Sequence, residues 1–433
     1  MDVMPIRSFA GLSQLVKDRI GSYGVRGAEM MIWRVVGLAA SAVGSIWAAR
    51  CLGPENLGIS GVVMSVVALV TLVVTLGLDN ACIRTVKGAL DDANVEEFVR
   101  TIVSVRTLVA LAFVIICGVA VAAAIWAGTI HSSWWLAIAA AFPLIYLQGN
   151  SALWLLQAKE LQLIQYRLIA GQSVFMAAVY LAFLRPGAPA GSDILVQAIA
   201  LTGMFCFAWR FATGLNLKGV LKVSITSARA GFRYANNERW AVAITFVVYF
   251  YTAFSLPLIG LRSTVPEAGR FRAAANLSQS VAAVLLIYTT IIYPRVLAWH
   301  QEAPEELFDR QIQAARLLLP WLIVTLICAA IGAPLLIPVV LGKQYLGSVW
   351  PFVVLVGAKL VLTLSSVFVA GVRAHRRDRM LCLCLIGVML CSIGLNWIIL
   401  PYYGALGAAC VSMFSECVVL VMCVCFCLQS VES

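Results

Sequence analysis

The sequence is poor in charged residues. Only 12% of its 433 residues are Asp, Glu, Lys or Arg, and only three are histidines. A soluble globular domain has about 25% charged residues, so this chain has roughly half the charged surface that a soluble fold needs. No long stretch has the composition of a soluble domain. A soluble enzyme or regulator of ordinary composition is therefore excluded.

The motifs of common enzyme classes are also missing. The sequence contains no Walker loop for phosphate binding, no HExxH zinc motif and no GxSxG nucleophile motif. The acidic pair Asp91–Asp92 lies between apolar runs, with no soluble catalytic fold around it. We therefore expect that the protein is not an enzyme and that it needs no cofactor.

Cysteine is plentiful, but the patterns of metal and redox sites are absent. None of the 13 cysteines belongs to a CxxC motif. Eight of them lie near the C-terminus within apolar runs: Cys382, Cys384, Cys391, Cys410, Cys417, Cys423, Cys425 and Cys427. Their spacing distributes them around helices, so we interpret them as small apolar residues. We predict no metal site among them.

What the sequence has in abundance is long apolar runs. Hydrophobic residues make up 62% of the chain. The runs are long enough to cross a hydrocarbon core of ~30 Å as helices, and they lack the alternation of an outer-membrane barrel. The sequence predicts an all-α polytopic membrane protein with about twelve spans, at 29–49, 57–78, 104–127, 133–156, 164–184, 193–213, 238–261, 275–297, 316–341, 349–371, 380–400 and 404–427.

The positions of lysine and arginine indicate the orientation of these spans, because cytoplasmic loops carry more of both residues. If the N-terminus is cytoplasmic, the inner segments hold 22 of the 31 Lys and Arg residues, and the outer loops hold six. Both termini are therefore expected in the cytoplasm. The same asymmetry explains the net charge of +11, so this charge gives no reason to expect a nucleic-acid partner.

Loop lengths divide the chain into two halves. A basic loop over 214–237 lies at the midpoint and is predicted to link an N-terminal six-helix lobe (29–213) to a C-terminal six-helix lobe (238–428). Residues 1–28 have no apolar core of a signal peptide. We expect them to form a cytoplasmic segment, either an interfacial helix or a basic tail, and 429–433 to form a cytoplasmic tail.

A short echo supports the division into halves. PENLG at 54–58 has a counterpart in PEAG at 266–269. Internal repeats are common in transporters, although a match this short also arises by chance.

Charged residues inside the predicted spans are candidates for function, because charge is costly within a membrane. Arg34 shares a helical face with Ser41 and Ser45, and Lys359 shares one with Thr363. Small and polar residues of this kind favour contacts inside a helix bundle. We predict that both cations point into the bundle, although an ion pair between Arg34 and Glu29 is an alternative.

Two further charges leave more than one interpretation open. Arg106 lies near the inner edge of its span, so it either extends to the membrane surface or contributes to a substrate site. Glu416 shares a face with Ser412. It is a candidate for ion coupling, or else a structural partner for a buried cation.

Amide and hydroxyl side chains recur along several spans. Gln148, Asn276 and Gln279 are the amides that we select as candidate substrate contacts. In lipid such groups must face water or other polar groups. They therefore predict either a wide polar cavity or hydrogen bonds between helices.

Several stretches together resemble polysaccharide flippases of the Wzx type, which belong to the multidrug/oligosaccharidyl-lipid/polysaccharide exporter (MOP) superfamily. They are RCLGPENLGISGVVMSV at 50–66, GLDNACIRTVKGA at 77–89, GRFRAAANL at 269–277, PVVLGKQYLGSVWPFVVL at 338–355, AGVRAHRRDRM at 370–380 and GLNWIILPYYGALGAACVSMFSE at 394–416. The similarity covers essentially the whole chain. One departure is Phe271 and Arg272, where a tyrosine and a small or polar residue are expected.

The resemblance implies two six-helix lobes around a V-shaped cavity in the bacterial inner membrane. It implies movement of an undecaprenyl-pyrophosphate-linked oligosaccharide to the periplasmic leaflet, for exopolysaccharide, capsule or O-antigen synthesis. It further implies coupling to a proton or sodium ion, and association with a polysaccharide polymerase and export machinery. The candidate cations Arg34 and Lys359 suit an anionic diphosphate.

Two other classes of function remain as alternatives. A drug or cation antiporter of the same superfamily would need carboxylates in its cavity, and Glu416 is the only acidic residue that we place deep in a span. A membrane glycan polymerase or glycosyltransferase would need a large outer loop, and the predicted outer loops are all short.

Overall fold

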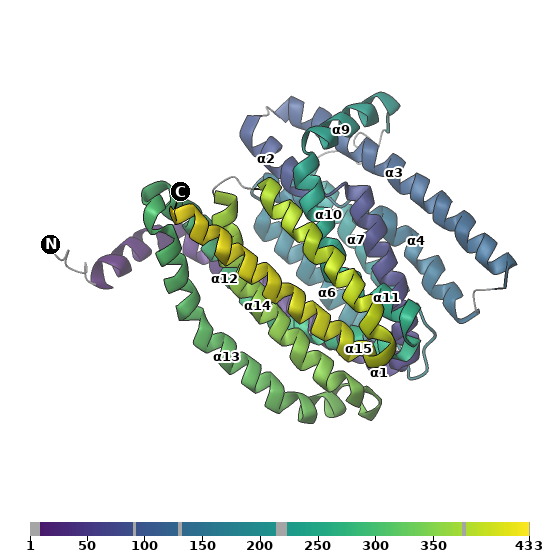
Figure 1. Ribbon diagram of the computed structural model, residues 1–433. Coiled ribbons are helices and arrows are strands. Elements are labelled where there is room, and N and C mark those ends of the chain that lie inside the picture. Colours follow the sequence, from purple (N-terminus) through teal and green to yellow (C-terminus); the bar gives the residue numbers. More distant parts are fainter. Residues whose placement is uncertain (1–8, 90–91, 129–131, 214–222, 375–377, 433) are drawn as a thin grey trace.

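The computed structural model describes residues 9–89, 92–128, 132–213, 223–374 and 378–432. Helices dominate this part of the chain, and it contains no strand. Figure 1 shows long helices packed side by side along one common direction. The predicted all-α membrane fold is confirmed.

The first half of the chain forms a bundle of long and short helices. In order they are α1 (Phe9–Thr75), α2 (Asp79–Ala89), α3 (Asp92–Trp126), the 3-10 turn η1 (Ser132–Trp134), α4 (Trp135–Gly149), α5 (Leu153–Ala158), α6 (Gln162–Phe183) and α7 (Ser192–Thr213). Residues 9–28, predicted as an N-terminal segment, continue without a break into the first span.

The second half begins inside the predicted linker, where part of that segment is helical. The elements are α9 (Ile225–Asn237), α10 (Arg239–Ala253), α11 (Ser255–Arg262), α12 (Val265–Glu302), η2 (Pro304–Glu306), α13 (Leu307–Val340), η3 (Lys343–Ser348), α14 (Val349–Ala374) and α15 (Asp378–Glu432).

Two of these helices are tight hairpins. Gly53 interrupts α1 with φ 72°, and Gly404 interrupts α15 with φ 48°. Glycine adopts positive φ without a steric penalty, and Pro54 follows the first break directly. Figure 1 shows α15 turning back alongside itself, from yellow-green to yellow. The break at Gly53 coincides with the predicted loop between the first two spans.

The number of spans is consistent with the sequence but is not determined. Among the described residues, eight helices are long and apolar enough to cross a membrane, or nine if α10 and α11, bent by 43°, form one span. Two of the eight are the broken helices α1 and α15. The count of twelve and the cytoplasmic location of both termini stay predictions.

The buried apolar side chains fall into separate groups. The largest cluster contains only residues of the first half, from Ile59 to Ala212. A second contains only residues of the second half, from Ile244 to Cys427. A third combines both halves and includes Ala49 and Tyr345. The third cluster is therefore where the two halves meet, and the boundaries of the two lobes stay predictions.

Candidate functional site

The two halves come closest where α1 crosses α12. A Cβ atom added to Gly58 would overlap the backbone oxygen of Val265, and one added to Gly269 would overlap the backbone oxygen of Pro54. Only glycine permits this approach of two backbones.

This crossing joins the two stretches of the sequence echo. PENLG at 54–58 contributes Gly58, and PEAG at 266–269 contributes Gly269. The hairpin turns lie nearby, because Glu267 accepts a hydrogen bond from the backbone of Ala405, 3.1 Å away, just after Gly404. We call this end of the molecule the closed end; in Figure 1 the labels of α1, α11 and α15 mark it.

An ion pair also bridges the halves at the closed end. Arg272 of α12 places Nη2 2.8 Å from Oδ2 of Asp193, in the first turn of α7. Its Nη1 donates to the backbone oxygen of Leu57 at 3.2 Å. The Asp193 side chain is 4% exposed and that of Arg272 is 15% exposed. The hydroxyl of Tyr180 donates to the backbone oxygen of Asp193 at 2.9 Å.

Further polar contacts close the same end. The hydroxyl of Tyr345 donates to the backbone oxygen of Ala49 at 2.8 Å, across the two halves. The Arg50 guanidinium donates to the backbone oxygens of Val339 and Val340. These carbonyls end α13 and have no partner within their own helix. A side chain of the first half therefore caps a helix of the second.

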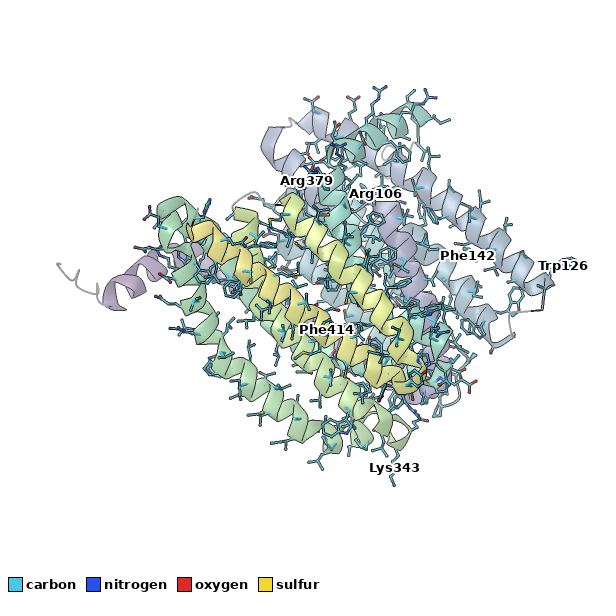
Figure 2. All side chains as sticks on the ribbon, in the orientation of Figure 1. Arg106, Trp126, Phe142, Lys343, Arg379 and Phe414 are labelled. Atoms are coloured by element: carbon cyan, nitrogen blue, oxygen red, sulfur yellow. The ribbon has the colours of Figure 1, made fainter. Side chains whose placement is uncertain are left out.

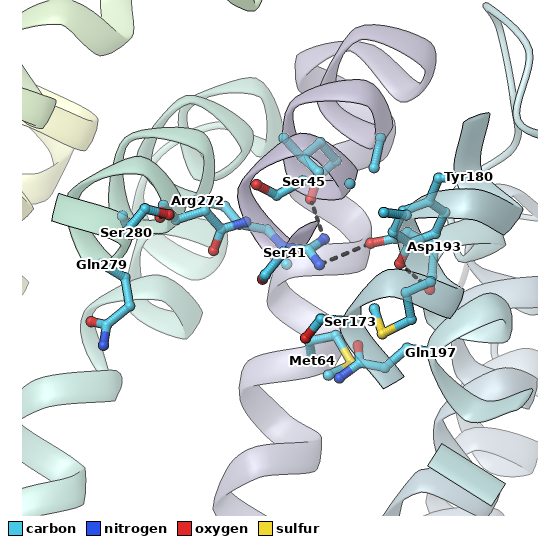
Figure 3. Close-up of a pocket in the computed structure, with 18 of the residues that line it drawn as sticks. Ser41, Ser45, Met64, Ser173, Tyr180, Asp193, Gln197, Arg272, Gln279 and Ser280 are labelled. Carbon is cyan, nitrogen blue, oxygen red and sulfur yellow. Dashed lines mark hydrogen bonds and ion pairs between the residues drawn. The ribbon is translucent and has the colours of Figure 1, made fainter. Parts of the chain in front are cut away.

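A cavity of about 500 Å³, with both polar and apolar side chains on its walls, extends from this ion pair between the two halves. Figure 3 shows Arg272 reaching from α12 towards Asp193 at its edge. Its polar lining includes Ser41, Ser45, Ser173, Gln197, Asn276, Gln279 and Ser280. Hydroxyl and amide groups of this kind satisfy a wet, hydrogen-bonding ligand and are poorly suited to lipid.

A smaller cavity of about 100 Å³ lies within the second half. Lys359 of α14 and Glu416 of α15 line it together with Tyr251, and Gln279 lines both cavities. Lys359 and Glu416 attract one another electrostatically, and Tyr251 lies within hydrogen-bonding reach of Glu416. Glu416 is 6% exposed, and its Oε2 has no hydrogen-bond partner among the described residues.

Four of the residues selected from the sequence line these cavities. Asn276 and Gln279 line the central cavity, and Lys359 and Glu416 line the smaller one. Glu416 thus lies in the same cavity as a buried cation, and its role as a structural partner of that cation stays a prediction. Whether it also couples an ion stays a prediction.

Arg34 lies about two helical turns from Ser41 on α1 and lines neither cavity. It is half-buried and has no hydrogen-bond or ion-pair partner among the described residues. The alternative pairing with Glu29 is absent, because Glu29 forms an ion pair with Arg167. Arg34 is therefore an unpaired cation near the cavity.

The placement of Arg106 corrects both interpretations of this residue. It neither extends to the surface nor lines either cavity, because it is only 1% exposed and its Nη2 lies 2.6 Å from Oδ1 of Asp79. Its guanidinium also lies 5.8 Å from the ring centroid of Trp154. Figure 2 shows it inside the helices of the first half, far from Trp126 at the tip of α3. Its ion-pair partner, Asp79, lies between two predicted spans, in a segment that was expected to be a loop.

Gln148 is likewise a contact between helices. Its side-chain oxygen accepts a hydrogen bond from Thr71 at 3.4 Å, and it lines neither cavity. This is the second of the two interpretations given above for the amide side chains.

The ion pair between Asp193 and Arg272 was not predicted from the sequence. Arg272 was expected in an outer loop, because the predicted span began at 275. The helix in fact begins at Val265, and Pro266 is the signal that marks this start, since proline favours the first turn of a helix. The departure at Arg272 from the flippase pattern therefore lies at the central cavity.

Solved structures with this fold are transporters of the MOP superfamily. The lipid II flippase MurJ in an inward closed conformation has a TM-score of 0.72 at 12% identity, over 94% of this chain and 87% of that one. A multidrug resistance MATE family transporter in an inward-facing conformation has a TM-score of 0.69 at 13% identity, over 94% and 98%. An outward-facing MATE transporter scores 0.59 at 13% identity, over 94% and 95%.

Sequence comparison identifies the family. No curated protein sequence matches this chain. The sequence profile described as "Polysaccharide biosynthesis protein" matches residues 48–350, which is most of the chain. The fold of a MOP-superfamily transporter agrees with this match. The chain therefore belongs to the polysaccharide biosynthesis protein family, with the fold of the MOP-superfamily flippases and transporters.

Proposed function

We propose that this protein moves an undecaprenyl-pyrophosphate-linked oligosaccharide from the cytoplasmic to the periplasmic leaflet of the bacterial inner membrane. The observation that carries the proposal is the cavity of about 500 Å³ between the two halves, with hydroxyl, amide and one cationic side chain among its lining residues. Hydroxyl and amide side chains on its walls suit a sugar, and Arg272 at its edge suits an anionic diphosphate. The apolar lipid chain remains in the bilayer.

Alternating access provides the mechanism. The predicted charge asymmetry favours the periplasmic side for the closed end, and in this proposal the substrate enters the cavity from the cytoplasmic side. Binding of the glycan is followed by rocking of one half against the other, which opens the closed end. Association with a polysaccharide polymerase and export machinery would then deliver the glycan to the next step.

The direct test is flipping in reconstituted vesicles. Vesicles containing the purified protein should move fluorescent undecaprenyl-pyrophosphate-linked oligosaccharide between leaflets, as measured by loss of signal to a membrane-impermeant quencher. Undecaprenol with the same fluorophore is the control that lacks the diphosphate. Export of a cationic dye such as ethidium without any flipping of the glycolipid would instead support the drug antiporter.

Arg34 is proposed to hold the diphosphate as it enters. Its guanidinium has no other partner among the described residues, and its planar fork suits bidentate contact with phosphate. A hydrogen bond to a charged group contributes about 1.5–3 kcal/mol, so Arg34→Ala should weaken substrate binding by about 10- to 100-fold. Arg34→Lys should retain part of the activity.

The control for Arg34 is Arg100→Ala, since Arg100 belongs to the same half and is already paired with Glu96. Flipping rates at several glycolipid concentrations separate binding from turnover. Native flipping by Arg34→Ala would remove Arg34 from the substrate path.

Glu416 is proposed to carry the coupling ion, either a proton or sodium. Its buried carboxylate has a free Oε2 and lines a cavity with Lys359. Glu416→Gln should abolish the response of flipping to an imposed proton or sodium gradient while leaving expression near normal. The control is the exposed acid Glu302, as Glu302→Gln. A Glu416→Gln protein that responds normally to both gradients would contradict the coupling role.

A further inference from the structure

The Asp193–Arg272 pair occupies a place that neither the sequence nor the flippase fold assigns to a function. We propose that this ion pair is the latch of the closed end, and that an anionic head group in the central cavity releases it by taking the Arg272 guanidinium from Asp193. The release step rests on the proposed function, because the head group is that of the proposed substrate. The latch itself rests only on the geometry.

The ion pair lies between the two halves of the chain. Arg272 belongs to α12, whereas both of its acceptors, Asp193 and the backbone oxygen of Leu57, belong to the first half. Tyr180 fixes the backbone at Asp193. One guanidinium therefore fastens α12 to two elements of the opposite half.

The central cavity contains few charged side chains. Among the described residues that line the central cavity, Arg272 is the only cation and Asp193 is the only acid. An anion that enters this cavity meets Arg272 as its nearest cation among them, and it competes with Asp193 for it. A diphosphate offers several acceptor oxygens to the fork of Arg272 and can replace both present partners at once.

Asp193 keeps part of its electrostatic stabilisation when Arg272 leaves. It lies in the first turn of α7, where the helix dipole favours a negative charge. Its Oδ1 is buried and has no hydrogen-bond partner among the described residues, so Arg272 is its one side-chain partner among them, and the helix dipole is what remains after release. Exchange of one anionic partner for another avoids leaving Arg272 uncompensated in a buried position.

A glycine of α1 leaves space for the Arg272 side chain. A Cβ atom on Gly61 would lie 2.8 Å from Cδ of Arg272, so the absence of a side chain at Gly61 makes room for the arginine. By contrast, Arg270 on the same helix pairs with Glu267, three residues away, and does not link the halves. Arg270 is therefore the matched control for a charge at the closed end.

Access to the cavity from the closed end tests the latch. Ser45 lines the cavity, and Ser45→Cys supplies a thiol for a membrane-impermeant maleimide added on that side. The same proteins with Ser45 retained correct for the native cysteines. Labelling should rise at least several-fold when Asp193→Asn or Arg272→Gln is added, and it should stay unchanged with Arg270→Gln. Unchanged labelling in the folded Asp193→Asn protein overturns the latch.

Exchanging the two charges distinguishes loss of the ion pair from a general loosening of the fold. The double variant Asp193→Arg with Arg272→Asp restores an ion pair of opposite polarity and should return labelling towards the parent level. If both single variants raise labelling but the exchange does not lower it, the pair acts by packing and the ionic latch is wrong. Size-exclusion profiles in detergent establish that each variant is folded.

The release step has its own measurement. Undecaprenyl pyrophosphate added to vesicles of the Ser45→Cys protein should raise labelling from the closed end, and undecaprenol should not. The Asp193→Asn variant should show high labelling with or without either lipid. If the pyrophosphate lipid has no effect while Asp193→Asn still opens the end, release by a diphosphate is wrong and the latch stands. The flipping assay tests the proposed substrate separately.

Discussion

Replacing Asp79 with alanine is expected to destabilise the protein by about 3 kcal/mol, because it strands the charge of Arg106. Removing one partner of a buried ion pair costs about 3–5 kcal/mol. We expect the low end, since the Asp79 side chain is 53% exposed while that of Arg106 is 2% exposed. No hydrogen bond at Nε would compensate for the lost one, because this atom of Arg106 has no hydrogen-bond partner among the described residues.

Thermal unfolding in detergent measures this effect, and two variants calibrate it. Glu96→Ala removes the partner of Arg100 in an exposed pair, which should cost only about 0.3–0.5 kcal/mol. The double variant Asp79→Ala with Arg106→Met removes both charges and should recover most of the lost stability. If Asp79→Ala unfolds at the same temperature as the parent, the pair does not stabilise this half.

The sequence predicted local structure well where a residue type has a strict backbone requirement. The turn at Gly53 followed from a glycine and a proline between two apolar runs, and the structure has it there. The start of α12 was missed by ten residues, because polar residues at its beginning resemble a loop. One of them, Arg272, is in fact buried against the other half by its ion pair with Asp193.

Contacts between distant segments were the part that the sequence could not supply. Lys359 and Glu416 were each selected as charges within a span, but nothing in the chain indicated that they share one cavity. Arg106 was selected for the same reason, yet its partner Asp79 makes it structural. The sequence can show that a charged residue lies within a span. Whether that residue stabilises the fold or lines a cavity depends on its neighbours in the folded protein.

The echo between 54–58 and 266–269 shows how a short pattern acquires meaning in three dimensions. From the sequence it was either a trace of a repeat or a coincidence. In the structure the two glycines that end these stretches touch across the halves, so the pattern marks the contact on which closure depends. A substitution there should therefore have a larger effect than one in either cavity.

Gly269→Val is accordingly expected to abolish flipping while leaving insertion and expression near normal. A Cβ atom at this position overlaps the backbone oxygen of Pro54 and lies 3.0 Å from the backbone nitrogen of Gly58. Backbone atoms cannot rotate away as a flexible side chain does. Overpacking of this kind costs about 1–3 kcal/mol or more, and here only the closed form pays it. The population of that form should fall by about 10- to 100-fold.

The measurement is flipping in vesicles, together with labelling of Ser45→Cys from the closed end, which should be high in the Gly269→Val protein. Gly118→Val is the control, because a Cβ at Gly118, in the last third of α3, would meet no atom within 4 Å beyond its own stretch of helix. It carries the same change of residue in a helix without touching the contact between the halves. Native flipping by Gly269→Val would show that the crossing of α1 and α12 does not have to close during transport.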